Sequence, residues 1–269
     1  RDNYEWDVGI HYIGEVHNKW SHVRKLFDLV SDGNLEWYKM DNNYDRIIFP
    51  EKQYNFVAPR EKFIEDMAIY FPGTEDKIHR YIQKVDDAVK RGQSYFANKA
   101  LPEWLGNFTY KKMTRKYFSH SDFTTRDTIM DIFNDEKILG VLTGQWGDHG
   151  LPPSQSSFSM HAMVVRHYLD GGNYPIGTSR RIAETAVDYL ESMGSNVYVS
   201  AGIDEIITHK GKAKGVRLEK GEEVNAPIII SSAGVMNTYG KFLKNDFLFH
   251  QLQGKLKTVN PTASYICLY

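Results

Sequence analysis

The clearest pattern of apolar and polar positions lies in residues 171–234, where helical spacing is followed by strict alternation. Apolar side chains at helical spacing predict an amphipathic helix with one buried face, formed by Ile182, Ala183, Ala186, Val187, Leu190 and Met193. A glycine loop precedes this helix, and Thr178 or Ser179 is expected to cap its first turn. Gly194 follows at the position where a left-handed residue commonly ends a helix.

Beyond this helix the pattern predicts β-structure. Residues 196–200 suit one brief strand. Alternating positions with tight glycine turns then predict an antiparallel meander, with strands at 203–209, 215–219 and 222–225. The apolar run 227–234 ends in small residues, which is typical of a strand buried on both faces whose end lets a ligand approach the backbone.

Residues 1–170 predict a mixture of strands and helices. The predicted strands are a hairpin at 35–40 and 44–49 and a third strand at 53–58. The predicted helices are 23–30, one opening at Pro59, one capped by Thr74 that carries a stripe from Ile78 to Val89, then 124–133, 136–146, and one that begins at Ser154 or Ser156 and carries Phe158. Residues 147–153 are predicted to form a loop.

Residues 101–116 give an irregular pattern in which aromatic and basic side chains gather. The aromatic ones are Trp104, Phe108 and Tyr110, and the basic ones are Lys111, Lys112, Arg115 and Lys116. Two interpretations are open. The stretch touches a membrane surface and admits a lipid, or it forms a solvated basic face beside buried aromatic side chains.

Composition changes this picture only a little. Acidic and basic residues nearly balance at a formal net charge of −1, so no overall charge favours nucleic acid or an anionic membrane surface. The single cysteine, Cys267, excludes an internal disulfide framework and fits a reducing compartment. No signal peptide and no membrane-spanning run is seen. We therefore expect a cytoplasmic location, with membrane association left open.

Several kinds of site are not expected. His161 and His167 are six positions apart and lie on different helical faces, and Asp148 and His149 are adjacent, so no metal site is predicted. The sequence contains no nucleophile elbow and no Walker-type loop, which argues against covalent nucleophilic catalysis and phosphoryl transfer.

Three runs carry a more specific resemblance. They are Trp-Asp-Val-Gly-Ile-His-Tyr-Ile-Gly at 6–14, Pro-Ser-Gln-Ser-Ser-Phe-Ser-Met-His-Ala at 153–162 and Ala-Gly-Val-Met-Asn-Thr-Tyr at 233–239. Together with the order loop, helix, strand, meander and buried strand, they resemble the two-domain flavoproteins of the retinol saturase, carotenoid isomerase and phytoene desaturase family. The resemblance covers nearly the whole chain, and the middle third matches in layout more than in residues.

The resemblance implies an α/β (α+β) fold with part of a Rossmann-like FAD domain and a sheet-and-helix substrate domain. Residues 1–14 and 171–245 would be the first and second parts of the FAD-binding domain, 15–170 the substrate-binding domain, and 246–269 a truncated return toward it. The family's Gly-x-Gly-x-x-Gly turn, which cradles a pyrophosphate, is not found. The glycines nearest to that pattern, at 144, 147 and 150, have the wrong spacing. We therefore expect a fragment of a longer protein.

The resemblance also implies which residues contact FAD. The cofactor-binding residues would be Gly9, Ile10, Gly172, Pro175, Ile203, Ser232, Ala233 and Gly234, and the candidates for catalysis are His11 and Tyr174. Each has a structural alternative. His11 would be a core histidine with its hydrogen bonds satisfied, Gly172 would merely end a helix, and residues 232–234 would pack a strand against a helix.

The implied function is that of an FAD-dependent oxidoreductase acting on carbon–carbon double bonds of a hydrophobic polyene, a retinoid or a carotenoid. Saturation, desaturation and isomerisation share one flavin and one kind of pocket, and the direction depends on an unidentified electron donor or acceptor. Two alternatives remain, a non-catalytic lipid- or protein-binding module and a flavin amine oxidase.

Overall fold

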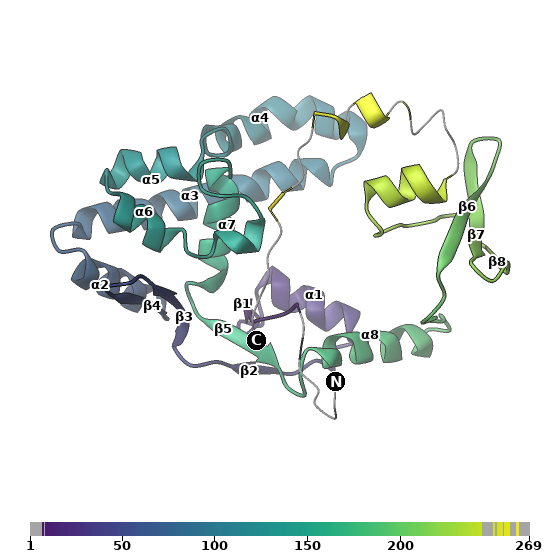
Figure 1. Ribbon diagram of the computed structural model, residues 1–269, viewed down its shortest axis with the longest axis horizontal. Coiled ribbons are helices and arrows are strands. Elements are labelled where there is room, and N and C mark those ends of the chain that lie inside the picture. Colours follow the sequence, from purple (N-terminus) through teal and green to yellow (C-terminus); the bar gives the residue numbers. More distant parts are fainter. Residues whose placement is uncertain are drawn as a thin grey trace. The chain divides into compact units, whose positions relative to one another are not determined.

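The computed structural model describes Asp7 and residues 9–243, 250, 252–254, 256–258 and 262–263. The chain divides into two compact units, Arg1–Met193 with Thr262–Tyr269, and Gly194–Pro261. Helices and β-sheets both occur, which confirms the predicted α/β class (Figure 1). The predicted assignment of segments to FAD-binding and substrate domains stays a prediction, and most of residues 246–269 lie outside the described part.

The first unit contains two small sheets. In one, β5 (Gly172–Pro175) lies between β1 (Ile13–Gly14) and β2 (Trp37–Lys39), antiparallel to both. In the other, β3 (Asn43–Ile48) pairs with β4 (Gln53–Val57). The predicted strand at 53–58 is confirmed. The predicted hairpin of 35–40 with 44–49 is wrong, because β2 pairs with a strand far along the chain and β3 pairs with β4.

The glycine loop predicted before α8 is confirmed only in part, because Gly172 begins the central strand β5 and only residues 176–179 form a turn. Alternation shows that a segment is extended, but it does not show which other segment supplies its hydrogen bonds. A pairing that joins Ile13 to Asn173 therefore leaves no local signal.

Helices make up most of the first unit. They are α1 (His22–Val30), α2 (Arg60–Tyr70), α3 (Glu75–Lys99), α4 (Glu103–Ser121), α5 (Thr125–Phe133), α6 (Glu136–Leu142), α7 (Phe158–Tyr168) and α8 (Arg180–Ser192), with a 3₁₀ turn η1 at Trp146–His149. Side chains cap several of them. Ser21 Oγ accepts from Arg24 N at 3.0 Å, and Thr124 Oγ1 accepts from Asp127 N at 3.0 Å.

Most of the predicted helices are confirmed, and three predictions need correction. The helix from Glu136 ends at Leu142 instead of reaching Trp146, and η1 occupies part of the predicted loop 147–153. The N-cap of α7 is Ser157, one residue after the predicted start. Residues 101–116 are not irregular, because they form most of α4. Only Thr114 and Tyr117 of α4 are buried, so exposed aromatic side chains obscure its helical period.

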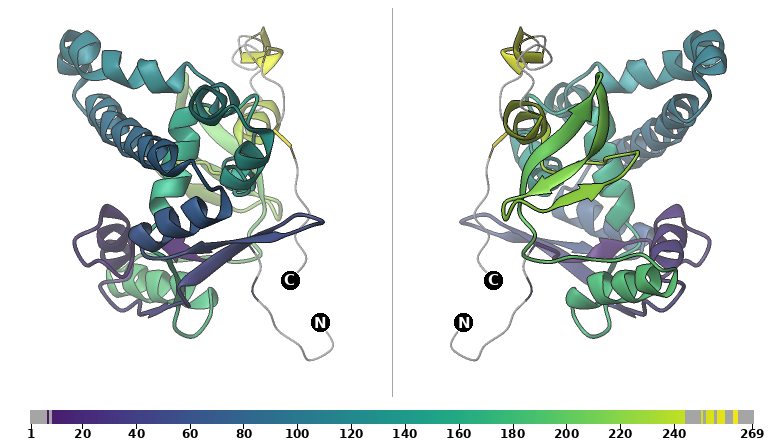
Figure 2. Two further views of the ribbon diagram at one scale, coloured as in Figure 1. Left: turned by 90° about the vertical axis from the view of Figure 1, so that its left-hand side faces the viewer. Right: turned by 90° about the vertical axis from the view of Figure 1, so that its right-hand side faces the viewer.

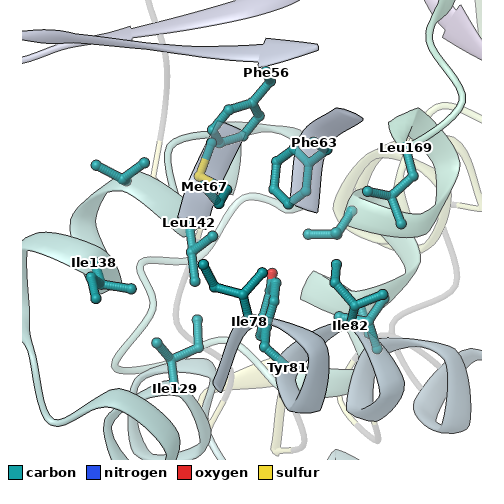
Figure 3. Close-up of a cluster of buried hydrophobic side chains, with 14 of the residues drawn as sticks. Phe56, Phe63, Met67, Ile78, Tyr81, Ile82, Ile129, Ile138, Leu142 and Leu169 are labelled. Carbon is teal, nitrogen blue, oxygen red and sulfur yellow. The ribbon is translucent and has the colours of Figure 1, made fainter. Parts of the chain in front are cut away.

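The core of the first unit is built around α3. Its stripe Ile78, Tyr81, Ile82, Val85 and Ala88 is buried at helical spacing, as predicted. This stripe packs with side chains from α2, α5, α6, α7 and β4, among them Phe56, Phe63, Met67, Ile129, Leu142 and Leu169 (Figure 3). In the described part of the chain, no helix combines the length and apolar character needed to cross a membrane.

The second unit is a three-stranded meander with a short helix. Strands β6 (Ile203–His209), β7 (Lys212–Leu218) and β8 (Glu223–Asn225) pair antiparallel in that order, which confirms the predicted meander. Lys210 and Gly211 both have positive φ at the turn between β6 and β7, as a tight hairpin requires. The π-helical turn η2 (Met236–Phe242) packs against β6.

Two predicted strands of this unit are wrong. Residues 196–200 and 227–234 form no strand, and Val199 and Ile230 are 86% and 93% exposed. An apolar run becomes a buried strand only where neighbouring strands satisfy its backbone groups and cover its faces. Among the described residues of this unit, no strand pairs with either segment.

The burial of each side chain predicts how much its truncation lowers the stability of the first unit. Ile82 is 1% exposed and Ile69, on α2, is 68% exposed. We expect Ile82→Ala to lower the free energy of unfolding by about 2–5 kcal/mol, because it leaves a cavity. The same change at Ile69 is expected to stay within about 0.5 kcal/mol. Urea unfolding of the two variants checks this, and equal losses would contradict the assigned core.

Candidate functional site

The first unit brings a group of polar and aromatic side chains together at the junction of β1, β3, η1 and α7. We call it the tyrosine–histidine cluster, and its members are His11, Tyr12, Tyr44, Asp45, Gln145, Asp148 and Tyr168. The rings of Tyr12 and Tyr168 are 4.6 Å apart and edge-on, and the rings of Tyr44 and Tyr168 are stacked at 6.4 Å. The cluster therefore combines an aromatic wall with ionisable groups.

Hydrogen bonds hold the cluster together across segments distant in sequence. The Tyr12 hydroxyl donates to Asp45 Oδ2 at 3.1 Å and accepts from Gln145 Nε2 at 3.2 Å. His11 Nε2 lies 3.5 Å from Asp148 Oδ1. These contacts orient Tyr12 and His11 relative to η1.

Burial and neighbouring charges shift the pKa values of the ionisable side chains in the cluster. The Asp148 carboxylate raises the pKa of His11 by hydrogen bonding and by its charge, and partial burial opposes this effect. Burial raises the pKa of Tyr12, together with the charge of Asp45, and the pKa of Tyr168, together with the charges of Asp148 and Asp45, so both phenols stay neutral. The side chain of His11 is 44% exposed and can exchange its proton with solvent. His11 is thus suited to deliver or take up a proton beside an aromatic surface.

A close approach between β1 and α7 positions this cluster. A Cβ on Gly14 would lie 1.7 Å from the carbonyl oxygen of His167, so no side chain fits there. Gly14 N donates to His167 Nε2 at 2.8 Å. Burial lowers the pKa of His167 and keeps its ring a neutral acceptor. The run that ends at Gly14 is therefore held directly against α7.

Gly172 and Pro175 lie on the central strand β5 and are buried. A Cβ on Gly172 would lie 2.9 Å from the Tyr12 ring and 3.3 Å from the Met40 sulfur. The missing side chain of Gly172 thus makes room for Tyr12. Pro175 pairs with Trp37. The role of Gly172 and Pro175 in contacting a cofactor stays a prediction.

The other predicted residues of this unit have different surroundings. Gly9 has a positive φ, and nothing lies within 4 Å of a Cβ built on it, so its backbone is open to a ligand. Ile10 is partly buried. The Tyr174 hydroxyl donates to Asp7 Oδ2, which also accepts from Ser179 N at 3.0 Å, and these bonds lower the pKa of Asp7. His11 and Tyr174 are therefore held by different carboxylates.

A second polar group lies in the core of the first unit. The Tyr81 hydroxyl and His161 Nε2 are hydrogen-bonded at 2.8 Å in the core, and burial lowers the pKa of His161 to about 3. The rings of His149 and His161 are 6.4 Å apart. Neither buried ring nitrogen of His149 has a hydrogen-bond partner among the described residues. No group of three metal-binding side chains is found in the described part of the chain.

In the second unit, the other predicted residues do come together. Two hollows of about 490 and 460 Å³ lie against β6 and residues 228–235. The first is lined in part by Ser232 and Gly234, and the second by Ile203, Ser232 and Ala233. Gly234 has a positive φ, and nothing lies within 4 Å of a Cβ built on it. Small, exposed residues therefore lie beside an apolar hollow, and their role in contacting a cofactor stays a prediction.

Sequence reasoning missed Tyr12, Asp45 and Gln145, and it considered Asp148 only as half of a poor metal pair. Tyr12 follows the candidate His11 directly in sequence, so its proximity to the site is predictable. Asp45, Gln145 and Asp148 join the cluster only through tertiary contacts, so no local signal marks them.

Comparisons with known proteins give relatives along most of the chain. All-trans-retinol 13,14-reductase of Danio rerio is 32% identical over 255 residues, which are 90% of this chain and 42% of that protein. The chloroplastic prolycopene isomerase of Daucus carota is 38% identical over 104 residues, 39% of this chain and 17% of that protein. The neurosporene-forming phytoene desaturase of Cereibacter sphaeroides is 28% identical over 191 residues, 70% of this chain and 33% of that protein.

The chain spans less than half the length of these curated relatives. No protein-family model matches it. The resemblance carried by residues 6–14, 153–162 and 233–239 is nevertheless confirmed, since the matched proteins are a retinol reductase, a carotenoid isomerase and a phytoene desaturase.

The carboxylate of Asp148 predicts a specific titration for His11. Asp148→Asn removes the charge that raises the His11 pKa, and we expect that pKa to fall. Asp45→Asn is expected to lower it less, because Asp45 acts only through its more distant charge. Asp188→Asn, an exposed change on α8, should leave it unaltered.

NMR titration of the imidazole protons of His11 measures all three variants. An unaltered His11 pKa in Asp148→Asn would show that the two side chains do not interact in solution.

Proposed function

Because the chain belongs to the family of retinol saturases, carotenoid isomerases and phytoene desaturases, we propose that it contributes to an FAD-dependent oxidoreductase. The substrate would be a hydrophobic polyene, a retinoid or a carotenoid, whose carbon–carbon double bonds are saturated, desaturated or isomerised. The observation that carries the proposal is the similarity to all-trans-retinol 13,14-reductase along most of this chain. That relative favours saturation as the reaction.

The residues that would hold FAD are those that the family resemblance implies. Ile203 and residues 232–234 would contact the adenosine part, and Gly9, Ile10, Gly172 and Pro175 would lie near the isoalloxazine. The open backbone at Gly9 and Gly234 supports this assignment, as do the hollows lined by Ile203 and residues 232–234. A bound flavin would supply the two-electron chemistry at the double bond.

The chain's own part in such a reaction is to hold the substrate and to move a proton. Saturation adds a hydride to one carbon and a proton to its neighbour. His11, whose pKa is raised by Asp148, would donate that proton from Nδ1, the ring nitrogen that does not face Asp148, and regain one from solvent. The aromatic wall of Tyr12, Tyr44 and Tyr168 would contact the polyene, since flat hydrocarbon packs well on aromatic rings. Tyr174 is the other candidate for the proton donor.

The partners follow from this chemistry. Saturation requires an electron donor and desaturation an electron acceptor, and neither is identified by the chain. A polyene dissolves in lipid rather than in water, so the proposal includes peripheral contact with a membrane. We do not propose a nucleic-acid partner, in line with the net charge of −1.

The visible absorption spectrum tests the cofactor. Protein produced from the complete open reading frame is expected to show the bands of oxidised flavin and to release FAD on denaturation. Reduced enzyme, mixed anaerobically with retinol or a carotenoid, is expected to reoxidise as the polyene is consumed. A folded, colourless protein that takes up no added FAD would instead support a non-catalytic binding module. Turnover of amines and not of polyenes would support a flavin amine oxidase.

Substitution of His11 tests the proton donor. In the same protein, His11→Gln is expected to slow polyene reduction by at least about 100-fold, because general acid catalysis typically contributes that much. His209→Gln, an exposed change on β6, is the matched control and should have no effect. Single-turnover rates are measured together with the amount of bound FAD, so that a slower chemical step is distinguished from loss of the cofactor. An unaltered rate in His11→Gln would assign the proton to another group.

A further inference from the structure

The helices α3 and α4 form an antiparallel hairpin whose joined ends project from the rest of the first unit (Figure 2). The turn between them is held firmly. The buried Asn98 side chain donates from Nδ2 to Gly106 O at 3.0 Å and to Thr109 Oγ1 at 2.9 Å. The rings of Tyr95 and Tyr117 stack at 4.4 Å and join the two helices farther back. The tip of the hairpin, residues 96–108, is therefore a rigid projection.

Large aromatic side chains cover this tip and face outward. Trp104 is 73% exposed, Phe108 is 86% exposed and Phe96 is 49% exposed. Trp104 and Phe108 lie one helical turn apart on α4, so they share a face. This finding contradicts the interpretation in which the aromatic side chains of residues 101–116 are buried beside a solvated basic face. Aromatic side chains gathered in this way on a projection mark an interaction surface.

Positive charge is concentrated directly behind the aromatic tip. Residues 90–116 contain the basic residues Lys90, Arg91, Lys99, Lys111, Lys112, Arg115 and Lys116 and a single acidic residue, Glu103. The whole chain, by contrast, has a formal net charge of −1. Lys111, Lys112 and Arg115 are exposed, and none of them forms an ion pair with another described residue. Their charge is thus available to a partner.

The order of these groups along α4 indicates what the partner is. Lys111 and Arg115 follow Phe108 at spacings of three and seven residues, about one and two helical turns, and therefore share its helical face. The aromatic rings come first from the tip, and the basic groups lie one to two turns behind them. A bilayer surface accepts this order, because aromatic rings settle at the level of the headgroups while lysine and arginine side chains meet anionic phosphates.

We propose that the tip of the α3–α4 hairpin attaches the protein to the surface of a bilayer that contains anionic lipids. The aromatic residues Phe96, Trp104 and Phe108 enter the headgroup region, and Lys111, Lys112 and Arg115 bind the anionic headgroups. A narrow helical tip suits insertion into lipid better than a protein interface, which typically buries about 800 Å² on each partner. The inference rests on the proposed function in one respect only: attachment to a bilayer would let the protein collect a lipid-soluble substrate.

Vesicle co-sedimentation tests the inference without any flavin or polyene. The protein from the complete reading frame is mixed with vesicles of phosphatidylcholine alone or of phosphatidylcholine with phosphatidylserine. We expect binding to the anionic vesicles to be the stronger. Lys111→Gln, Lys112→Gln and Arg115→Gln together are expected to weaken it about 100-fold, since each basic residue near a surface contributes about a fivefold effect. Trp104→Ala with Phe108→Ala is expected to weaken binding to both vesicles at least tenfold, an order-of-magnitude estimate.

Matched controls separate the hairpin from exposed residues elsewhere. Trp20→Ala removes an indole that is 81% exposed on the same unit, and a triple change of Lys210, Lys212 and Lys214 to Gln removes three exposed charges from the β6–β7 hairpin. Both controls should bind vesicles as the unsubstituted protein does. Far-ultraviolet circular dichroism confirms that each variant is folded.

Quenching of tryptophan fluorescence by brominated phospholipid gives a second readout. Trp104→Phe is expected to lose most of the quenching, and Trp20→Phe is expected to keep it. Binding that the hairpin changes do not weaken, or that the controls weaken equally, would overturn the proposal. A protein that binds neither kind of vesicle would also overturn the proposal. If, in addition, the double variant Trp104→Ala with Phe108→Ala has a different oligomeric mass, the hairpin tip is a contact between proteins.

Discussion

The pairing of β5 with both β1 and β2 is the constraint on which the first unit depends. It brings residues 172–175 between two segments near the start of the chain. It is possible only because Gly14 and Gly172 carry no side chain at the points where the backbone meets His167 and Tyr12. The His11–Tyr12 segment is thereby placed against α7 and η1. The aromatic wall, the carboxylates and the imidazole of the candidate site all follow from that placement.

Local sequence signals predicted the local structure well. The stripe of α3 and the glycine turns of the meander depend on residues close together in the chain. The predicted caps at Thr74 and Ser179 are wrong, because neither side chain forms a cap hydrogen bond at the start of α3 or α8. Predictions failed where partners are distant. The strands at 35–40 and 44–49 look like a hairpin, yet each pairs elsewhere. In α4 the side chains of Trp104 and Phe108 point outward, so hydrophobicity does not follow the buried face of the helix.

In the candidate site, too, local features are predictable from the sequence and long-range contacts are not. Residues 9–11 lie in a run that resembles a flavoprotein family, and the relatives confirm this resemblance. The carboxylates that orient His11 and Tyr12 could not be foreseen, because Asp148 and Asp45 reach them through the fold. Residues 203 and 232–234, by contrast, lie close enough in sequence to line adjoining hollows of one unit. The family resemblance indicates which segments to consider as a site, whereas the carboxylates beside His11 and Tyr12 are known only from the tertiary contacts.

Three histidines that are fully or partly buried couple the folding of the first unit to acidity. Burial lowers the pKa of His149, His161 and His167 below the ordinary value of 6.5, so the folded state binds these protons more weakly than the unfolded chain does. In the unfolded chain they would be protonated below that value. Unfolding in weak acid therefore takes up protons, and the folded state loses stability as the pH falls below about 6.5. His11, whose pKa is raised, acts in the opposite sense, and its contribution is lost as the pH rises. Because His161 and His167 both lie on α7, the helix that packs the core also makes it sensitive to acid.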